Sequence, residues 1–149
     1  MQAVDFSLSD QHDVVHKLSA YKGKWVIVYF YPKDDTPGCT KEACSFRDSY
    51  HTLQAKGVQI LGISKDSVAS HKKFADKYEL NFPLLSDPQA EVIKAYGAWG
   101  EKKFMGKTFA GVLRMTFLIN PAGEIVKTYE NVNPLGHAEK ILKDFEEIA

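Results

Sequence analysis

The chain has 149 residues, of which 44% are apolar and 26% are charged. This length and composition are typical of a globular protein with a substantial core, so we expect a single domain over residues 1–149. Lys plus Arg and Asp plus Glu number 19 each, giving a net charge of zero. Charge therefore gives no indication of a nucleic-acid or membrane partner.

The longest aromatic and aliphatic run, residues 25–31, has seven residues. A membrane-spanning helix needs roughly 20 apolar residues, so none is expected here. Residues 1–13 are polar and acidic, unlike a signal peptide, and we expect a cytoplasmic protein. In a reducing compartment two cysteines seldom form a permanent structural disulfide, so Cys39 and Cys44 favour a catalytic, redox or metal role.

The first half of the chain predicts two buried strands, each followed by a helix. Residues 24–31 (KWVIVYFY) are almost continuously β-branched and aromatic, as in a central strand, and Pro32 ends the run. After the turn-rich stretch 33–38, apolar residues recur at helical spacing until Gly57. Residues 58–64 then predict a second buried strand, and 67–80 an amphipathic helix.

The second half predicts shorter elements and an antiparallel hairpin. We expect a strand at 82–85 and a helix at 88–96, with Asp87 as N-cap. Two strands, 111–119 and 124–129, flank the turn Asn-Pro-Ala-Gly, and a final helix spans 135–148. Together the elements predict an α/β fold, with a central mixed β-sheet flanked by helices on both faces.

Cys39 follows a tight loop and falls in the first turn of the next predicted helix. The first backbone N–H groups of a helix are unpaired and carry the positive end of its dipole, so they stabilise a thiolate. The alternative is an inert, buried cysteine. The polar neighbours of Cys39, Thr-Pro-Gly before it and Thr-Lys-Glu after it, favour the reactive interpretation.

Cys44 lies five positions after Cys39, which is neither the Cys-x-x-Cys spacing of dithiol reductases nor a common zinc pair. A zinc site needs two further ligands, and the five histidines are scattered, so we expect no metal site. Cys44 is either a second redox residue or a core residue on the buried face of its helix. Its apolar neighbours Ala43 and Phe46 leave both interpretations open.

Pro32, Thr36 and Cys39 form the pattern Pro-x-x-x-Thr-x-x-Cys, which resembles the active-site motif of peroxiredoxins. The stretch TPGCTKEACSFRD is similar to the bacterioferritin comigratory protein, or peroxiredoxin Q, branch of that family. Matching segments extend over almost the whole chain: DFSL at 5–8, GIS-x-DS at 62–67, FPLLSD at 82–87, R-x-TFLI at 114–119 and NP-x-G at 120–123.

The resemblance implies a thioredoxin-like fold and the reduction of hydrogen peroxide and organic hydroperoxides without metal or flavin. It assigns Cys39 as the peroxidatic cysteine and Cys44 as the cysteine that resolves it through an intrachain disulfide. Thioredoxin or a similar dithiol protein would recycle the enzyme. Because the resolving cysteine lies in the same chain, no second subunit is needed and we expect a monomer.

The resemblance also assigns Arg114 as the active-site arginine. It is the only charged residue in the apolar run 112–119, where a buried guanidinium would need a partner. The alternative is an edge-strand arginine that faces solvent. Glu42, about one helical turn after Cys39, either orients Arg114 or is a solvated helix acid.

The other motif residues have expected roles around the thiolate. Thr36 would offer its hydroxyl to the thiolate or peroxide oxygen, or serve as a helix N-cap, and the two roles are compatible. Pro32 and Pro37 would fix the shape of the loop, and Gly38 would permit close backbone approach.

Two other functions remain as alternatives. A thioredoxin-like disulfide reductase would act on protein disulfides, but the chain lacks Cys-x-x-Cys. A redox-sensing module would use Cys39 and Cys44 as a switch and would bind a partner instead of turning over peroxide.

Overall fold

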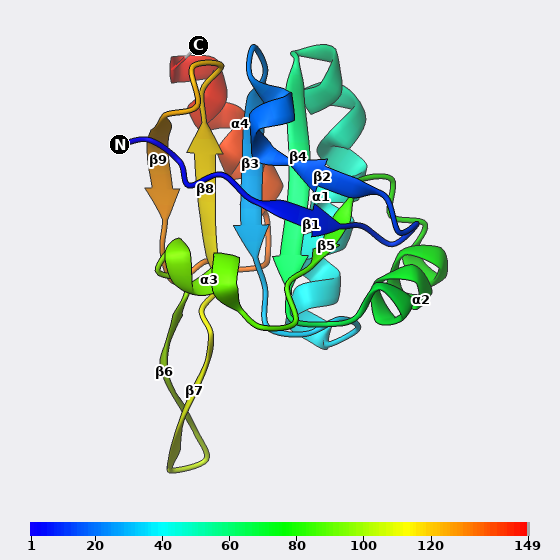
Figure 1. The fold of residues 1–149 in the computed structure, drawn as a ribbon, viewed down its shortest axis with the longest axis vertical. Coiled ribbons are helices and arrows are strands. Elements are labelled where there is room, and N and C mark those ends of the chain that lie inside the picture. Colours follow the sequence, from blue (N-terminus) through cyan, green and yellow to red (C-terminus); the bar gives the residue numbers. More distant parts are fainter. Residues whose placement is uncertain (149) are drawn as a thin grey trace.

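The computed structural model describes residues 1–148, and a seven-stranded mixed sheet forms its centre (Figure 1). The strand order is β2-β1-β5-β4-β3-β8-β9. The strands of this sheet are β1 (Ser7–Ser9), β2 (Val15–Lys17), β3 (Trp25–Phe30), β4 (Val58–Ser64), β5 (Leu84–Ser86), β8 (Met115–Ile119) and β9 (Ile125–Tyr129). The helices are η1 (Leu18–Tyr21), α1 (Pro37–Ala55), α2 (Val68–Tyr78), α3 (Glu91–Ala95) and α4 (His137–Ile148).

The β-branched and aromatic run of β3 forms the middle of the sheet. It pairs in parallel with β4 and antiparallel with β8, while β4 pairs in parallel with β5. Alternate β3 side chains enter two hydrophobic clusters, because successive residues of a strand point to opposite faces. One cluster includes α1, α2 and α4, and the other includes η1 and α3. The expected mixed sheet with helices on both faces is confirmed.

The cluster beneath α1 contains one very close approach. A Cβ atom added at Gly62 of β4 would lie 2.9 Å from the Tyr29 ring of β3. That ring stacks on Phe46 of α1, with 4.5 Å between ring centroids. Only glycine therefore leaves room for this aromatic stack below the middle of α1.

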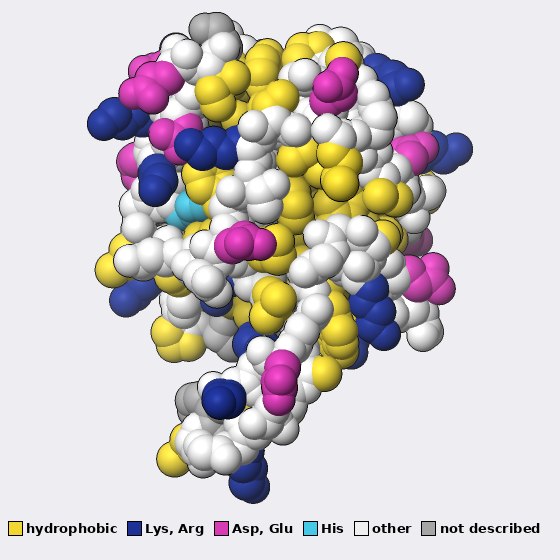
Figure 2. All heavy atoms as spheres, turned by 90° about the vertical axis from the view of Figure 1, so that its left-hand side faces the viewer, with side chains coloured by type: hydrophobic (Ala, Val, Ile, Leu, Met, Phe, Trp, Pro, Cys, Tyr) yellow, Lys and Arg dark blue, Asp and Glu magenta, His cyan; other side chains and the backbone are white. Residues whose placement is uncertain are grey.

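The predicted strand over 111–119 is wrong, because two separate strands occupy this range. β6 (Trp99–Phe104) and β7 (Lys107–Val112) form a hairpin of their own, and β8 begins at Met115. Met105 and Gly106 connect β6 to β7, both with positive φ, which is the geometry of a type I′ turn. Figure 2 shows this hairpin projecting from the body of the protein.

Two further expectations need correction. The helix predicted over 88–96 is only α3, although Asp87 does accept hydrogen bonds from the backbone N–H groups of Glu91 and Ile93. The chain before α3 contains Ala90 at φ +56°, outside the helical region. Strands β1 and β2 are absent from the expected elements, because the sequences SLS and VHK are short and mostly polar, whereas the equally short β5 stands out by its apolar residues. In the described part of the chain, no helix is long and apolar enough to cross a membrane.

Candidate active site

The first turn of α1 carries Cys39, as the sequence predicts. Pro37 is the first residue of the helix, where its missing N–H costs nothing, and Cys39 is the third. The unpaired N–H groups of this turn give the Cys39 sulfur a positive electrostatic environment. Cys39 is nevertheless 1% exposed and packs in the core cluster. Burial alone would fit an inert cysteine, so its polar contacts decide between the two interpretations.

Arg114 links Cys39 to Glu42. Its Nη2 donates to the Cys39 sulfur at 3.2 Å, and its Nη1 donates to Oε1 of Glu42 at 2.7 Å. The Glu42 side chain is fully buried, which excludes the interpretation as a solvated helix acid. The Arg114 side chain is 17% exposed, which excludes a solvent-facing arginine. The guanidinium is therefore held between a sulfur atom and a carboxylate in a largely dry site.

The position of Arg114 differs from the sequence expectation. It does not lie within a strand but in the link formed with Leu113 between β7 and β8. Its backbone carbonyl accepts a hydrogen bond from Val132 N at 3.2 Å, so the loop after β9 also holds it. This break between two strands lets one charged side chain turn toward α1 instead of entering the sheet.

Burial controls the charges around the sulfur. It raises the pKa of Glu42 from 4.5 to about 7, against the opposing effect of Arg114. Burial by itself would lower the pKa of Arg114. The negative charges of Glu42 and Cys39 have a larger combined effect, so the pKa of Arg114 lies above its usual value. Among described residues, Oε2 of Glu42 and the Tyr29 hydroxyl are buried without a hydrogen-bond partner. The Glu42 carboxyl is thus poised to titrate near neutral pH.

The other motif residues surround this group without contacting the sulfur directly. Thr36 occupies the N-cap position of α1, and its hydroxyl donates to the Lys33 carbonyl at 3.0 Å instead of to Cys39. A Cβ atom added at Gly38 would lie 3.3 Å from Nη2 of Arg114, so this glycine does permit the close approach. Pro32 lies in the bend after β3, consistent with the expected role in loop shape.

Cys44 lies in the same continuous helix as Cys39 and is partly exposed. Both cysteines are free thiols. Partial exposure argues against the alternative of a simple core residue, for which the neighbours Ala43 and Phe46 are better examples. The structure therefore has the reduced form of the cysteine pair.

A buried polar network anchors the loop before Cys39, and the sequence patterns did not reveal it. Asp34 is 7% exposed and accepts hydrogen bonds from Tyr31 at 2.6 Å and Ser70 at 2.8 Å. It also contacts Nδ1 of His71 at 2.7 Å, while its backbone N–H donates to Asp66. The available signal in the sequence is the pair of acids, Asp34 and Asp35, inside the motif. These groups already satisfy one another, so we assign the network to anchoring the loop.

Helix α2 holds this region on both sides of the cysteines. Before them, Asp35 accepts hydrogen bonds from Lys77 at 2.8 Å and from the Tyr78 hydroxyl at 2.7 Å. After them, Nη1 of Arg47 donates to the Tyr78 carbonyl at 2.7 Å. Both flanks of the cysteine-bearing segment are therefore fastened to one helix.

A well-formed hollow in the described surface lies away from these residues. It has a volume of about 560 Å³ and is lined by β9, the following loop and the start of α4, without Cys39, Glu42 or Arg114. A peroxide group is small, so the chemistry of the side chains identifies the site better than the volume of a hollow does.

Comparison with known proteins agrees with this assignment. The AhpC/TSA family model matches residues 1–128. Peroxiredoxin Bcp of Escherichia coli strain K12 is 44% identical over 147 residues, covering 99% of this chain and 94% of that protein. Peroxiredoxin Bcp of Bacillus subtilis is 40% identical over 148 residues, with 99% and 94% covered.

Solved structures of peroxiredoxins also resemble this chain closely. A variant of Xanthomonas campestris peroxiredoxin Q superimposes with a TM-score of 0.92 at 38% identity, covering 97% of this chain and 92% of that one. The bacterioferritin comigratory protein of the same organism superimposes with a TM-score of 0.90 at 37% identity, covering 95% and 90%. The chain belongs to the AhpC/TSA family and is a thiol-dependent peroxidase of the peroxiredoxin Q, or Bcp, type.

Proposed function

We propose that this peroxiredoxin reduces hydroperoxides at Cys39 and resolves the oxidised cysteine with Cys44. The observation that carries the proposal is the 3.2 Å contact between Arg114 and the Cys39 sulfur at the start of α1. A guanidinium and unpaired helix N–H groups both stabilise a thiolate and the negative charge that develops on a departing oxygen. The group thus supports nucleophilic attack by sulfur on a peroxide.

The proposed reaction is balanced by two cysteines and one external dithiol. The Cys39 thiolate attacks one peroxide oxygen, the O–O bond breaks, and protonation of the leaving oxygen gives water or an alcohol. Cys39 is then a sulfenic acid. The Cys44 thiol condenses with it, forming an S–S bond and releasing water, and a dithiol reductant reduces the disulfide by exchange.

Formation of this disulfide requires α1 to unwind. Residues five apart on an ideal helix differ by about 7.5 Å of rise and about 140° of rotation, which separates their Cα atoms by roughly 8.7 Å. A disulfide needs Cα atoms about 4.4–6.8 Å apart. Because Cys39 and Cys44 share one continuous helix in the reduced form, the reactive and disulfide geometries exclude each other.

The remaining parts of the proposal concern substrates, reductant and setting. The bacterioferritin comigratory protein of Xanthomonas campestris has alkyl peroxide reduction activity, which supports organic hydroperoxides, besides hydrogen peroxide, as substrates of this protein. We further propose thioredoxin or a similar dithiol protein as reductant, a cytoplasmic location, one domain and a monomeric enzyme. The resolving cysteine in the same chain is the reason to expect a monomer.

Peroxide consumption by the purified protein with a thioredoxin system tests the proposal. Cys39→Ser should abolish consumption, whereas Cys44→Ser should still form sulfenic acid but recycle poorly. Melting temperatures of both variants establish that they are folded. Retained peroxidase activity in Cys39→Ser would refute the assignment. A single oxidation without turnover would support the redox-sensing alternative, and insulin reduction would support the disulfide reductase.

A further inference from the structure

Lys102 of β6 reaches from the projecting hairpin back toward the active site. Its Cδ atom passes 3.2 Å from the position of a Cβ atom at Gly111, and its Nζ donates to the Val112 carbonyl at 2.9 Å. Arg114 follows Val112 by only two residues. The side chain is partly buried, whereas neighbouring Lys103 is exposed. The Lys102 ammonium therefore lies at the base of the hairpin, close to the link that carries Arg114.

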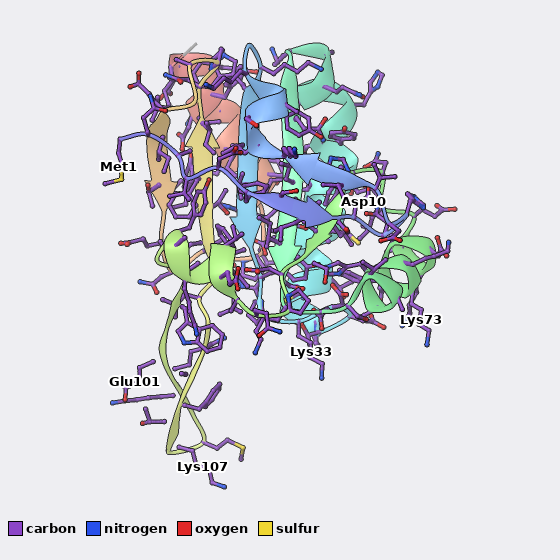
Figure 3. The ribbon with its side chains drawn as sticks, viewed as in Figure 1. Met1, Asp10, Lys33, Lys73, Glu101 and Lys107 are labelled. Atoms are coloured by element: carbon purple, nitrogen blue, oxygen red, sulfur yellow. The ribbon has the colours of Figure 1, made fainter. Side chains whose placement is uncertain are left out.

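The hairpin and the active-site loop lie at the same end of the sheet. Figure 1 shows β6 and β7 leaving the fold at the end where β3 finishes and α1 begins. Figure 3 shows Lys33, which belongs to the β3–α1 loop, at this same end, while Glu101 and Lys107 mark the projecting hairpin. The Lys102 ammonium, bonded to Val112 at the base of this hairpin, thus lies at the end of the sheet where α1 begins.

The charges of the site act on Lys102. Burial lowers the pKa of its ammonium, Arg114 lowers it further, and the negative charge on Cys39 raises it. Electrostatic coupling is mutual, so a thiolate that favours the Lys102 cation is favoured by that cation to the same extent. The geometric link runs along the chain: Lys102 is hydrogen-bonded to Val112, and two residues later Arg114 contacts the Cys39 sulfur at 3.2 Å.

The charge balance around Cys39 explains why a second cation matters. Arg114 pairs with Glu42 as well as with Cys39, so the negative charge of ionised Glu42 offsets the positive charge of the guanidinium. Other groups around Cys39 and Arg114 do not compensate: burial raises the pKa of Tyr29 well above its usual value, and burial lowers the pKa of His137 in α4, which Arg114 also affects, to about 4. Both are neutral at pH 7. Lys102 supplies an additional positive charge on the side of the hairpin, while Lys140 of α4 acts on His137.

We propose that Lys102 is a positioning residue of the active site, a second cation that stabilises the Cys39 thiolate against the buried Glu42 carboxylate. The inference rests on the proposed role of Cys39 as the peroxidatic cysteine. Lys102 contacts neither the sulfur nor the peroxide, and it acts through the electrostatic potential at Cys39. The hairpin would then complete the charge environment of a site whose other groups lie in α1 and beside β8.

The test compares Lys102→Met, Lys102→Arg and Lys103→Met in a Cys44→Ser background, where Cys39 is the single thiol. The ultraviolet absorbance of the thiolate is titrated against pH, and the rate of sulfenic acid formation with hydrogen peroxide is measured. Lys102→Met should move the titration midpoint up by about 0.5 pH unit and slow the reaction about threefold below that midpoint. Lys102→Arg should retain both properties, and Lys103→Met should match the parent.

Two further measurements, the effect of added salt and the melting temperature, distinguish an electrostatic role of Lys102 from a purely structural role in the hairpin. If Lys102 acts by charge, high salt should narrow the difference between Lys102→Met and the parent. If Lys102 only braces the hairpin through Val112, Lys102→Met lowers the melting temperature but leaves the titration unchanged, which overturns the proposal. Absence of sulfenic acid in the parent itself would instead refute the role of Cys39.

Discussion

Replacing Glu42 by Gln should change how the stability of the protein depends on pH. Burial raises the pKa of Glu42 from 4.5 to about 7, so the folded protein binds more protons than the unfolded chain between these values. The free energy of unfolding therefore falls as pH rises through this range, and a shift of this size amounts to about 3 kcal/mol. Gln cannot titrate, so Glu42→Gln should lack this decline.

Urea unfolding of the reduced protein from pH 4.5 to 8 measures the effect. The difference in unfolding free energy between Glu42→Gln and wild type should grow by about 3 kcal/mol toward high pH. Glu147→Gln is a matched control, because Glu147 is exposed and its variant should remain parallel to wild type. Parallel curves for Glu42→Gln as well would refute the buried, proton-binding carboxyl inferred from the structure.

Three further outcomes test the site and its surroundings. Arg114→Ala should lower the rate constant for peroxide attack at least about tenfold, or about 1.4 kcal/mol, in stopped-flow measurements; an unchanged rate in the folded variant contradicts its role. Gly62→Ala should lower the unfolding free energy by about 1–3 kcal/mol because its Cβ meets the Tyr29 ring, and unaltered urea midpoints would disprove that packing. On oxidation, amides 39–46 should lose hydrogen-exchange protection, whereas equal protection in both redox forms would exclude unwinding.

The sequence predicts the central elements well because their signals are local. β3 and β4 are continuous apolar runs, and the helix after the Thr-Pro-Gly loop places Cys39 in its first turn. The hairpin β6–β7 was missed because Met105, with φ +51°, occupies a turn position where Asn or Asp before Gly is the usual signal. The run 111–119, in which Arg114 is the only charged residue, gives no sign of the break between β7 and β8.

The contacts that complete the site could not be predicted from local patterns. Arg114 and Glu42 are 72 residues apart in the chain, and their ion pair depends on how the link before β8 meets α1. The same holds for His71, whose helical spacing places it on α2 but does not reveal Asp34 as its partner 37 residues away. The sequence motif identifies each site residue separately. The burial of these residues and the pairs they form depend on the tertiary structure.

The contacts of α2 with Asp35 and Arg47 limit the part of the protein whose conformation changes when the two cysteines are oxidised. Both contacts lie outside the segment 36–46, so they can persist while that segment rearranges around a disulfide. We expect the sheet and α2 to look alike to a partner in both forms. A reductant must bind the oxidised enzyme and then release the reduced one. It would distinguish the two forms by segment 36–46 alone, and the contacts between reductant and enzyme that depend on redox state would form and break at this segment.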